Sequence, residues 1–177
     1  MMHRAEEISS YQFKPSDKLL LDTNIWLLVY VPQKPGDSRV AVYSNALRNI
    51  LAAQSRIYID VLIASEFITQ YARLKHQLIA PKVKFKDFRK SQDFKPVAHD
   101  IAADFKRVLK HCTRIEDSFE SLAIDALINE YAVGESDFND QILTTLCKSR
   151  DLKLVTDDAD FKDCGIPVVT ANKCLLA

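Results

Sequence analysis

The chain takes its organisation from residues 18–24, whose sequence is Lys-Leu-Leu-Leu-Asp-Thr-Asn. The three consecutive leucines predict a short buried strand, because a strand covered on both faces of a parallel sheet is a continuous apolar run. The run stops at Asp22, which we expect at the carboxyl end of a central strand. Open α/β sheets bind their ligands at that edge, so Asp22 marks the expected position of a functional site.

Short strands alternate with amphipathic helices along the rest of the chain. Apolar runs predict strands at residues 57–60, 152–156 and 166–170. Apolar residues at helical spacing predict helices at 38–54, 61–78, 96–112, 120–131 and 137–150. This alternation predicts an α/β fold, a three-layer α/β/α sandwich with a central parallel sheet. We expect a loose N-terminal arm at 1–17 and one domain at 18–177, with a basic insertion at about 80–96.

Charge is distributed unevenly along the 177 residues, although the formal net charge is zero. Residues 73–114 contain twelve Lys and Arg against four Asp and Glu, a local charge of +8. Residues 115–163 contain four Lys and Arg against thirteen Asp and Glu, a local charge of −9. Such a split suits an anionic polymer held near an acidic, metal-binding cluster. Folding could equally interleave these charges on an ordinary solvated surface.

Several functional classes are disfavoured by composition. The three glycines, Gly36, Gly134 and Gly165, lie too far apart for a P-loop or a dinucleotide-binding fingerprint. The four cysteines form no Cys-x-x-Cys pair, so neither a disulfide framework nor a structural zinc is predicted. The N-terminal residues lack a signal-peptide apolar region, and no apolar run is long enough to span a bilayer. We therefore expect a cytoplasmic protein without a membrane segment.

Four acids occur where the predicted elements would bring them to one rim of the sheet. Asp22 ends a strand and Glu66 lies in the second turn of a helix. Asp140 lies in the first turn of a helix starting near 136–137, and Asp158 follows another strand. Clustered carboxylates raise one another's pKa unless a cation neutralises them. Mg²⁺ or Mn²⁺ does so with oxygen ligands, activates water and stabilises in-line phosphoryl displacement.

The order of these motifs resembles the PIN-domain nucleases, including the VapC-type toxins of toxin–antitoxin pairs. The resemblance covers roughly residues 18–170. It is carried by Leu-Leu-Leu-Asp22-Thr-Asn, Ser-Glu66-Phe, Phe-Asn-Asp140-Gln-Ile-Leu and Leu-Val-Thr-Asp-Asp158-Ala-Asp-Phe. The longer, basic segment between the second and third acids departs from the family pattern.

The resemblance implies a metal-dependent endoribonuclease that uses Mg²⁺ or Mn²⁺, is often a homodimer, and can act as a toxin with an antitoxin partner. It implies that the substrate is RNA. The implied catalytic and metal-binding residues are Asp22, Glu66, Asp140 and Asp158. Asp160 is a candidate further metal ligand, and Asn24 and Thr156 are candidate substrate-binding residues.

Each candidate also has an ordinary structural explanation. Asp140 could be a first-turn acid that complements the helix dipole, and Glu66 could be a solvated helix residue. Asp157 or Asp160 could serve in place of Asp158, and Asn after a strand is also common turn chemistry. Two other acids, Asp60 and Asp137, are predicted to be helix N-caps.

The basic insertion alternates cations with phenylalanines. Residues 82–95 contain six Lys and Arg against two acids. Aromatic side chains stack on bases while lysines contact phosphates, so we predict substrate contacts from Lys84, Lys86, Arg89 and Lys90. In the alternative interpretation the segment is a solvated loop whose phenylalanines anchor it to the domain.

Two other functions remain compatible with the sequence. A non-catalytic RNA-binding or partner-binding module would keep the fold and lack metal-dependent cleavage. A haloacid-dehalogenase-like phosphatase is indicated weakly by Asp157-Asp158-Ala159-Asp160, which resembles that family's late acidic motif. Its nucleophile motif requires Asp-x-Asp, whereas the residue two positions after Asp22 is Asn24.

Overall fold

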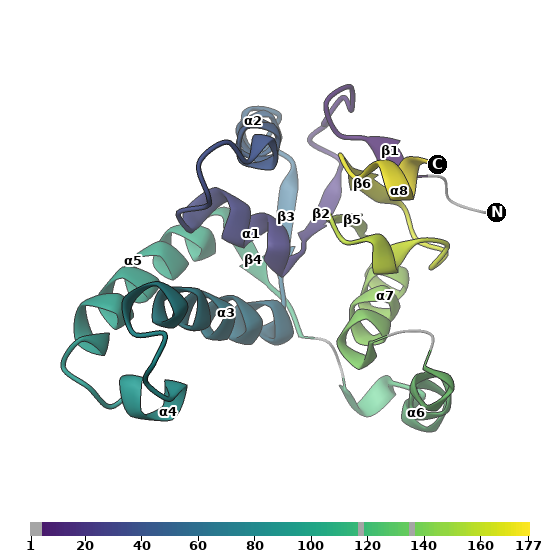
Figure 1. Cartoon of the computed structure of the whole chain (residues 1–177). Coiled ribbons are helices and arrows are strands. Elements are labelled where there is room, and N and C mark those ends of the chain that lie inside the picture. The colour runs from purple at the N-terminus through teal and green to yellow at the C-terminus, as the bar shows by residue number, and fades with distance from the viewer. Residues whose placement is uncertain (1–4, 117–118, 135–136) are drawn as a thin grey trace.

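A six-stranded parallel sheet forms the middle layer of the computed structural model, which describes residues 5–116, 119–134 and 137–177 (Figure 1). The strands are β1 (Glu6–Glu7), β2 (Lys18–Leu21), β3 (Arg56–Ile59), β4 (Cys112–Arg114), β5 (Lys153–Val155) and β6 (Val168–Thr170), in the order β1-β6-β5-β2-β3-β4. Leu20 in β2 lies opposite Tyr58 on one side and Leu154 on the other. The structure confirms the predicted α/β/α architecture with the leucine strand at its centre.

Helices cover both faces of the sheet (Figure 1). One face carries α1 (Thr23–Tyr30), α2 (Ser38–Ala52), α3 (Val61–Ile79), α4 (Phe85–Phe88) and α5 (Phe94–His111). The other carries α7 (Phe138–Arg150), with α6 (Ile124–Val133) outside it. This division follows from right-handed crossovers, because the chain advances from β2 to β4 and then returns to β5. The remaining elements are α8 (Lys173–Leu176) and the 3₁₀ turns η1 (Phe119–Ser121) and η2 (Ala159–Phe161).

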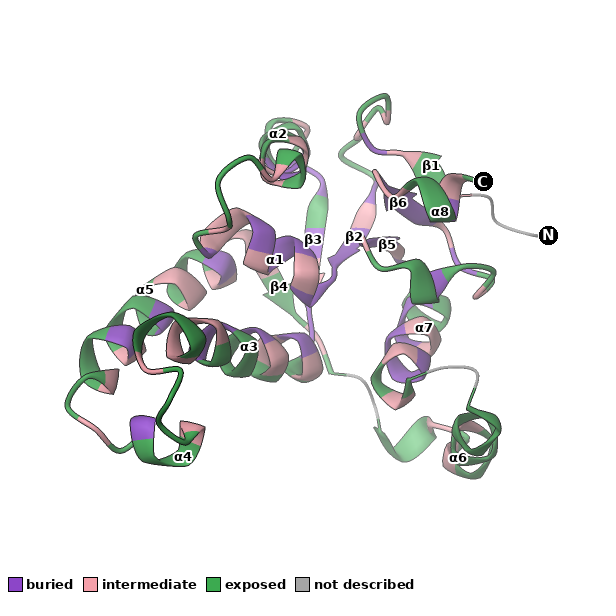
Figure 2. Cartoon of the chain, viewed as in Figure 1, coloured by how far each residue is buried: buried purple, intermediate pink, exposed green. Residues whose placement is uncertain are grey.

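The core lies along β2 and its neighbours, as the buried strands in Figure 2 show. The side chains of Leu19, Leu20 and Leu21 are at most 1% exposed, and Trp26 and Leu154 are fully buried. The outer helix α6, by contrast, contains no buried residue. Within the described residues, no helix combines the length and apolar character needed to cross a membrane.

The helices that follow the strands begin at the carboxyl edge of the sheet, and acids cap them. Asp60 accepts a hydrogen bond from the backbone N–H of Ile63 at 3.0 Å and begins α3. Asp137 accepts one from the backbone N–H of Asn139 at 2.8 Å and begins α7. Both acids are therefore N-caps, as predicted.

The predicted arm at 1–17 lies partly outside the described residues, and its described part packs onto the domain. Glu6 in β1 lies opposite Val169 in β6, and Ile8 is only 3% exposed. Asp17 then accepts hydrogen bonds from the backbone N–H of Lys14 at 2.9 Å and the hydroxyl of Tyr11 at 3.2 Å. A two-residue strand has no periodicity that a sequence pattern could reveal.

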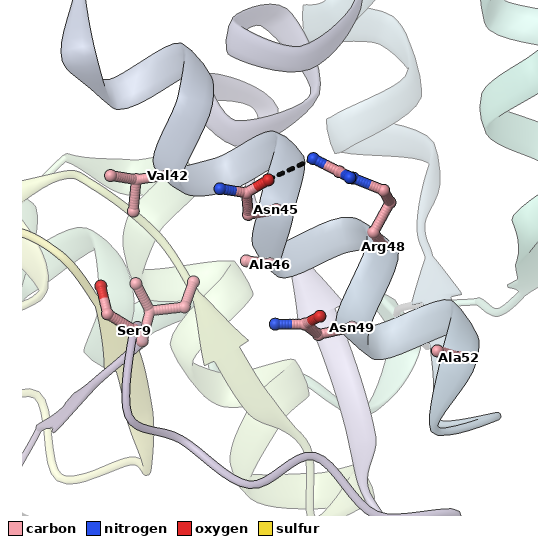
Figure 3. A pocket seen from close by; sticks show the side chains of 8 residues that line it. Ser9, Val42, Asn45, Ala46, Arg48, Asn49 and Ala52 are labelled. Atoms are coloured by element: carbon pink, nitrogen blue, oxygen red, sulfur yellow. Dashed lines mark hydrogen bonds between the residues drawn. The ribbon is translucent and has the colours of Figure 1, made fainter.

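A polar groove of about 600 Å³ separates this N-terminal segment from α2 (Figure 3). Ile8 and Ser9 line one side, and Asn45 and Asn49 line the other. Arg48 donates a hydrogen bond to the side-chain oxygen of Asn45 on the same helix. Beside the groove, β1 and the buried Ile8 join this segment to the domain.

The basic insertion forms a turn and α4, which packs on the C-terminal half of α3. The ring of His76 lies 5.4 Å from that of Phe85 and 5.2 Å from that of Phe88. Phe88 is 1% exposed and packs edge-on against Phe94, with 5.5 Å between ring centroids. The phenylalanines thus anchor the insertion to the domain, which is the second of the two interpretations considered above.

Ile8 should contribute measurably to stability because its side chain is buried in the core, whereas the other described apolar residues of the N-terminal segment are only partly buried. We expect Ile8→Ala to lower the free energy of unfolding by about 2 kcal/mol or more, the cost of a buried large-to-small change. Denaturant unfolding measures it, with the exposed neighbour substitution Ser9→Ala as the matched control. Equal stabilities for the two variants would mean that the segment does not pack as described.

Candidate active site

Asp22 lies at the carboxyl edge of the sheet, directly after the last residue of β2, and is 6% exposed. Its backbone N–H donates to the carbonyl of Val155 in the neighbouring strand at 3.0 Å. Its carboxylate Oδ1 accepts from the backbone N–H of Thr23 at 2.6 Å, so Asp22 is also the N-cap of α1. The acid is therefore fixed by two strands and a helix.

The second carboxylate oxygen of Asp22 is oriented by two side chains. Oδ2 accepts hydrogen bonds from the amide of Asn24 at 2.6 Å and the hydroxyl of Thr156 at 2.7 Å. The Asn24 amide also lies 3.1 Å from the Thr156 hydroxyl oxygen, and Thr156 is fully buried. Asn24 and Thr156 therefore hold the carboxylate of Asp22 in position. The Thr156 side chain is not accessible to a substrate in this structure, because the residue is fully buried.

Glu66 joins this network through Thr23. The hydroxyl of Thr23 donates to Oε2 of Glu66 at 3.0 Å, which links the start of α1 to the second turn of α3. The side-chain amide of Gln70, one turn further along α3, approaches Oε1 at 3.5 Å. Sequence reasoning did not single out Thr23, although its position directly after Asp22 was the available signal.

The three acids in the loop after β5 have different surroundings. The carboxylate of Asp157 accepts from the hydroxyl of Tyr43 at 2.7 Å and from the guanidinium of Arg39 at 3.1 Å. The backbone N–H of Asp158 donates to the hydroxyl of Thr156 at 3.0 Å, and the carboxylate Oδ1 of Asp158 accepts from the backbone N–H of Asp160 at 3.0 Å. The carboxylate of Asp157 is therefore bound to side chains of α2, and Asp158 is the acid that adjoins the hydrogen bonds around Asp22.

The acids on opposite faces of the sheet influence one another electrostatically. The pKa of Asp22 is raised to about 6; burial is the largest cause, the charges of Glu66 and Asp158 add to it, and the hydrogen bonds from Thr156 and Thr23 oppose it. The pKa of Asp140 is raised to about 7, chiefly by burial and further by the charges of Asp22, Asp137, Asp158 and Asp160. The structure thus brings the predicted acids into one field of mutual repulsion.

A cavity of about 370 Å³ opens beside this cluster. Asn24 from α1, Arg39 from α2 and Leu74 from α3 line it together with Asp157 and Asp158. The cavity provides space next to the acids, bounded by one cation and by apolar helix surface.

The sequence matches the PIN domain family over residues 19–166. The chain belongs to the PIN domain family. The crystal structure of VapBC2 from Rickettsia felis bound to a DNA fragment from their promoter includes a chain of similar fold, with a TM-score of 0.57. The two chains are 16% identical, and the match covers 86% of this chain and 98% of that one. No curated protein matches the sequence.

The acids of this PIN domain fit a hard divalent cation by the chemistry of their donors. They offer carboxylate oxygens, and burial and mutual repulsion hold the pKa of Asp22 and Asp140 above its ordinary value. Within the described residues, however, no three His, Cys, Asp or Glu side chains already have the spacing of a metal site. Repelling carboxylates must approach one another to coordinate an ion, so binding would require side-chain movements.

The predicted substrate-binding cations lie apart from the acid cluster. Lys84, Lys86, Arg89 and Lys90 are all exposed on or beside α4. The anchor of α4 on α3 is His76, ten residues beyond Glu66 and hence about 15 Å further along the helix. These cations could meet only a ligand that extends along α3.

The stability of the metal-free protein should depend on pH through Asp22 and Asp140. Their pKa values rise from 3.8 to about 6 and about 7 in the folded state, so the folded protein binds protons more tightly than the unfolded chain. Stability should therefore fall as pH rises from about 4 to about 7. Asp140→Asn removes one titrating group and should flatten this fall in chelator-treated protein.

Denaturant unfolding across that pH range measures the effect, and Asp151→Asn is the matched control. Asp151 ends the same helix with a side chain 93% exposed, and Asn tolerates its left-handed backbone. Asp22→Asn is less informative, because its new amide would face donors from Asn24 and Thr156. An unchanged pH profile in Asp140→Asn would contradict the described environment.

Proposed function

We propose that this PIN domain is an endoribonuclease that depends on Mg²⁺ or Mn²⁺. The observation that carries the proposal is the gathering of acids at the carboxyl edge of the sheet, where Asp22 follows the central strand and Asp140 lies in the first turn of α7. Burial and neighbouring negative charges oppose the ionised form of both acids. Such an arrangement has a chemical purpose when a divalent cation and a phosphodiester complete it.

The proposed metal ligands are Asp22, Glu66, Asp140 and Asp158, with Asp160 as an additional ligand at the exposed rim. When bound, the ion would activate water and stabilise the charge that develops on the phosphate. The chain's own contribution is orientation. Asn24 and Thr156 hold Oδ2 of Asp22, and Thr23 holds Oε2 of Glu66. These donors orient the carboxylates of Asp22 and Glu66, which favours a defined coordination geometry.

The charge distribution supports a nucleic-acid substrate, and RNA is proposed because of the resemblance to the VapC-type ribonucleases. The acidic cluster repels a polyanion, whereas residues 73–114 carry a local charge of +8 on the same face of the sheet as α1 and α3. An extended strand could leave the acids and continue along α3 toward α4. We propose that Lys84, Lys86, Arg89 and Lys90 contact its phosphates, which would add affinity with little sequence selectivity.

The proposed setting is a toxin of a toxin–antitoxin pair, acting in the cytoplasm as a homodimer. The support is the fold shared with a chain of the VapBC2 complex, together with membership of the PIN family. The second candidate function is a non-catalytic binding module, which the absence of ready metal spacing within the described residues would permit. Metal-dependent cleavage separates the two.

A cleavage assay tests the proposal directly. Purified protein is incubated with a mixed panel of single-stranded and structured RNAs in Mg²⁺, in Mn²⁺ and in chelator. We expect cleavage only with metal, and a loss of about 100-fold or more in Asp140→Asn, the scale on which removing a preorganised charge partner acts. Asp151→Asn, at the other end of α7, should cleave as wild type does.

Calorimetric titration with Mn²⁺ tests the proposed metal site, and the cleavage assay then distinguishes the two candidates. Endoribonuclease activity requires that Mn²⁺ binds, that Asp140→Asn weakens binding, and that Asp151→Asn does not. Metal binding without cleavage of any RNA in the panel would favour the binding module. Equal affinity in both variants would remove the acids from the metal site altogether.

The four cations of the basic insertion should contribute to the affinity for RNA. Changing Lys84, Lys86, Arg89 and Lys90 together to Ala should weaken RNA binding and reduce its salt dependence. Each lost phosphate contact should lower the log–log salt slope by about 0.7, the value for single strands. Turnover at saturating RNA should change little, because the acids are untouched.

A charge-matched control separates local contacts from net charge. Four exposed lysines elsewhere are replaced by Ala in the control variant, namely Lys14, Lys148, Lys162 and Lys173. Filter binding at several salt concentrations measures both slopes. If the log–log salt slope of RNA binding falls by the same amount in the two fourfold variants, the insertion makes no specific contact with RNA.

A further inference from the structure

Gln33, in the loop between α1 and α2, has its side-chain amide fixed in one orientation. The nitrogen Nε2 donates to the carbonyl oxygens of Leu27 at 2.9 Å and of Val31 at 3.0 Å. Both partners can only accept, so the nitrogen must face them and the oxygen Oε1 is left for another partner. Among the residues that the structure describes, none donates a hydrogen bond to Oε1. The side chain therefore presents a fixed acceptor and no free donor.

Gln33 lines the cavity of about 370 Å³ that opens beside the acids. Asn24 and Asp158, from the candidate active site, line the same cavity. Leu27 and Leu74 supply apolar walls, and both are half-buried and packed against the core. The volume of the cavity is within the range of small-ligand sites. A group bound in it would therefore lie next to the proposed metal ligands.

Most other polar side chains of the cavity are bound to protein partners. The amide nitrogen of Asn24 donates to two side chains of the candidate active site, and its oxygen accepts from the backbone N–H of Asp157 at 3.2 Å. The guanidinium of Arg39 pairs with Asp37 at 2.7 Å and with Asp157 at 3.1 Å. Among the described lining residues, Oε1 of Gln33 is therefore the uncharged polar side-chain atom whose hydrogen-bonding capacity is unused.

The charges around the cavity disfavour a phosphate inside it. Its charged lining residues are one cation, Arg39, and two carboxylates, Asp157 and Asp158, so the lining is net negative. A neutral planar group with an N–H donor at its edge would fit both the leucine walls and the acceptor of Gln33. Nucleobases combine these features, because their faces pack against apolar side chains and their edges form hydrogen bonds.

We infer that the cavity binds one nucleobase of the RNA and that Gln33 selects bases with an exocyclic amino group. The inference rests on the proposed function, in which the neighbouring acids and their metal hold a phosphate of the same strand. The amino group of cytosine or adenine would donate to Oε1. Uracil has no amino group, and its ring N–H lies between two carbonyl oxygens that would repel Oε1. Gln33 would thus supply a base preference, which phosphate contacts from α4 do not.

Two RNA probes that differ at one ring position test the selection. Fluorescein-labelled dodecamers of cytidine and of uridine carry an amino group and a carbonyl oxygen, respectively, at that position. Fluorescence anisotropy measures their binding to Asp140→Asn in Mg²⁺, a variant that should leave the probes uncleaved, and to the wild-type chain in chelator. We expect about fivefold tighter binding of the cytidine probe, which is the scale of one hydrogen bond. Equal affinities of the two probes would overturn the inference.

A third probe separates the hydrogen bond from the repulsion. A dodecamer of pyrimidin-2-one riboside carries a hydrogen atom in place of the amino group of cytidine. It loses the donor without gaining the carbonyl oxygen that would repel Oε1, so its affinity should lie between those of the other two probes. Affinity equal to that of the cytidine probe would mean that the amino group is not recognised, and would reject the inference.

Adjacent residues of the loop provide a matched pair of variants. Gln33→Met keeps the length of the side chain but removes its acceptor, and should reduce the preference for cytidine to less than about twofold. Lys34→Met introduces the same side chain at an exposed position outside the cavity. It should affect the two probes alike and keep the preference. If Gln33 only fastens its loop to α1, Gln33→Met will lower stability and leave the preference unchanged, which would contradict the inference.

The ratio of the two affinities separates this inference from the proposed nuclease activity, because it is measured without cleavage. A cytidine preference that disappears in Gln33→Met supports base selection even if the wild-type chain cleaves no RNA in any metal. Metal-dependent cleavage together with a preference that survives in Gln33→Met would keep the nuclease and reject the base site. The loss of the preference in Lys34→Met as well would also reject it, since that side chain lies outside the cavity.

Discussion

A carboxylate buried at the end of the central strand is the constraint on which the rest of the structure depends. Asp22 is 6% exposed, yet burial and neighbouring acids oppose its charge. Three donors, from Thr23, Asn24 and Thr156, make the charge tolerable. They come from the start of α1 and the end of β5, so the site requires those elements to meet at one edge. The parallel register of β2 with β5 brings them there.

Helix α2 also serves the site, although it contributes no acid to the cluster. Tyr43 is fully buried, and its hydroxyl donates to Asp157 while accepting from the backbone N–H of Ala171 at 3.0 Å. Arg39 holds the other oxygen of Asp157. The backbone N–H of the next residue, Asp158, donates to the hydroxyl of Thr156. The two adjacent acids therefore have different surroundings: Asp157 is attached to α2, and Asp158 adjoins the hydrogen bonds around Asp22.

The sequence was sufficient to predict the features with strong local signals. The leucine run, the alternation of strands and helices, the caps Asp60 and Asp137 and the convergence of the acids all follow from patterning. Strands β1 and β4, of two and three residues, carry too little periodicity to be recognised. The roles of Thr156 and Tyr43 depend on contacts more than 110 positions apart, which no local pattern encodes. The anchoring of the basic insertion likewise depends on His76, a residue outside it.

The charge split separates two tasks of the proposed site. The acids at the carboxyl edge of the sheet repel phosphates, whereas the cations on and beside α4 lie next to His76, about 15 Å beyond Glu66 along α3. A strand that meets both groups must therefore extend along α3. In such an arrangement affinity and cleavage depend on different parts of the chain, because phosphate contacts add binding energy wherever they are made and cleavage requires the acids.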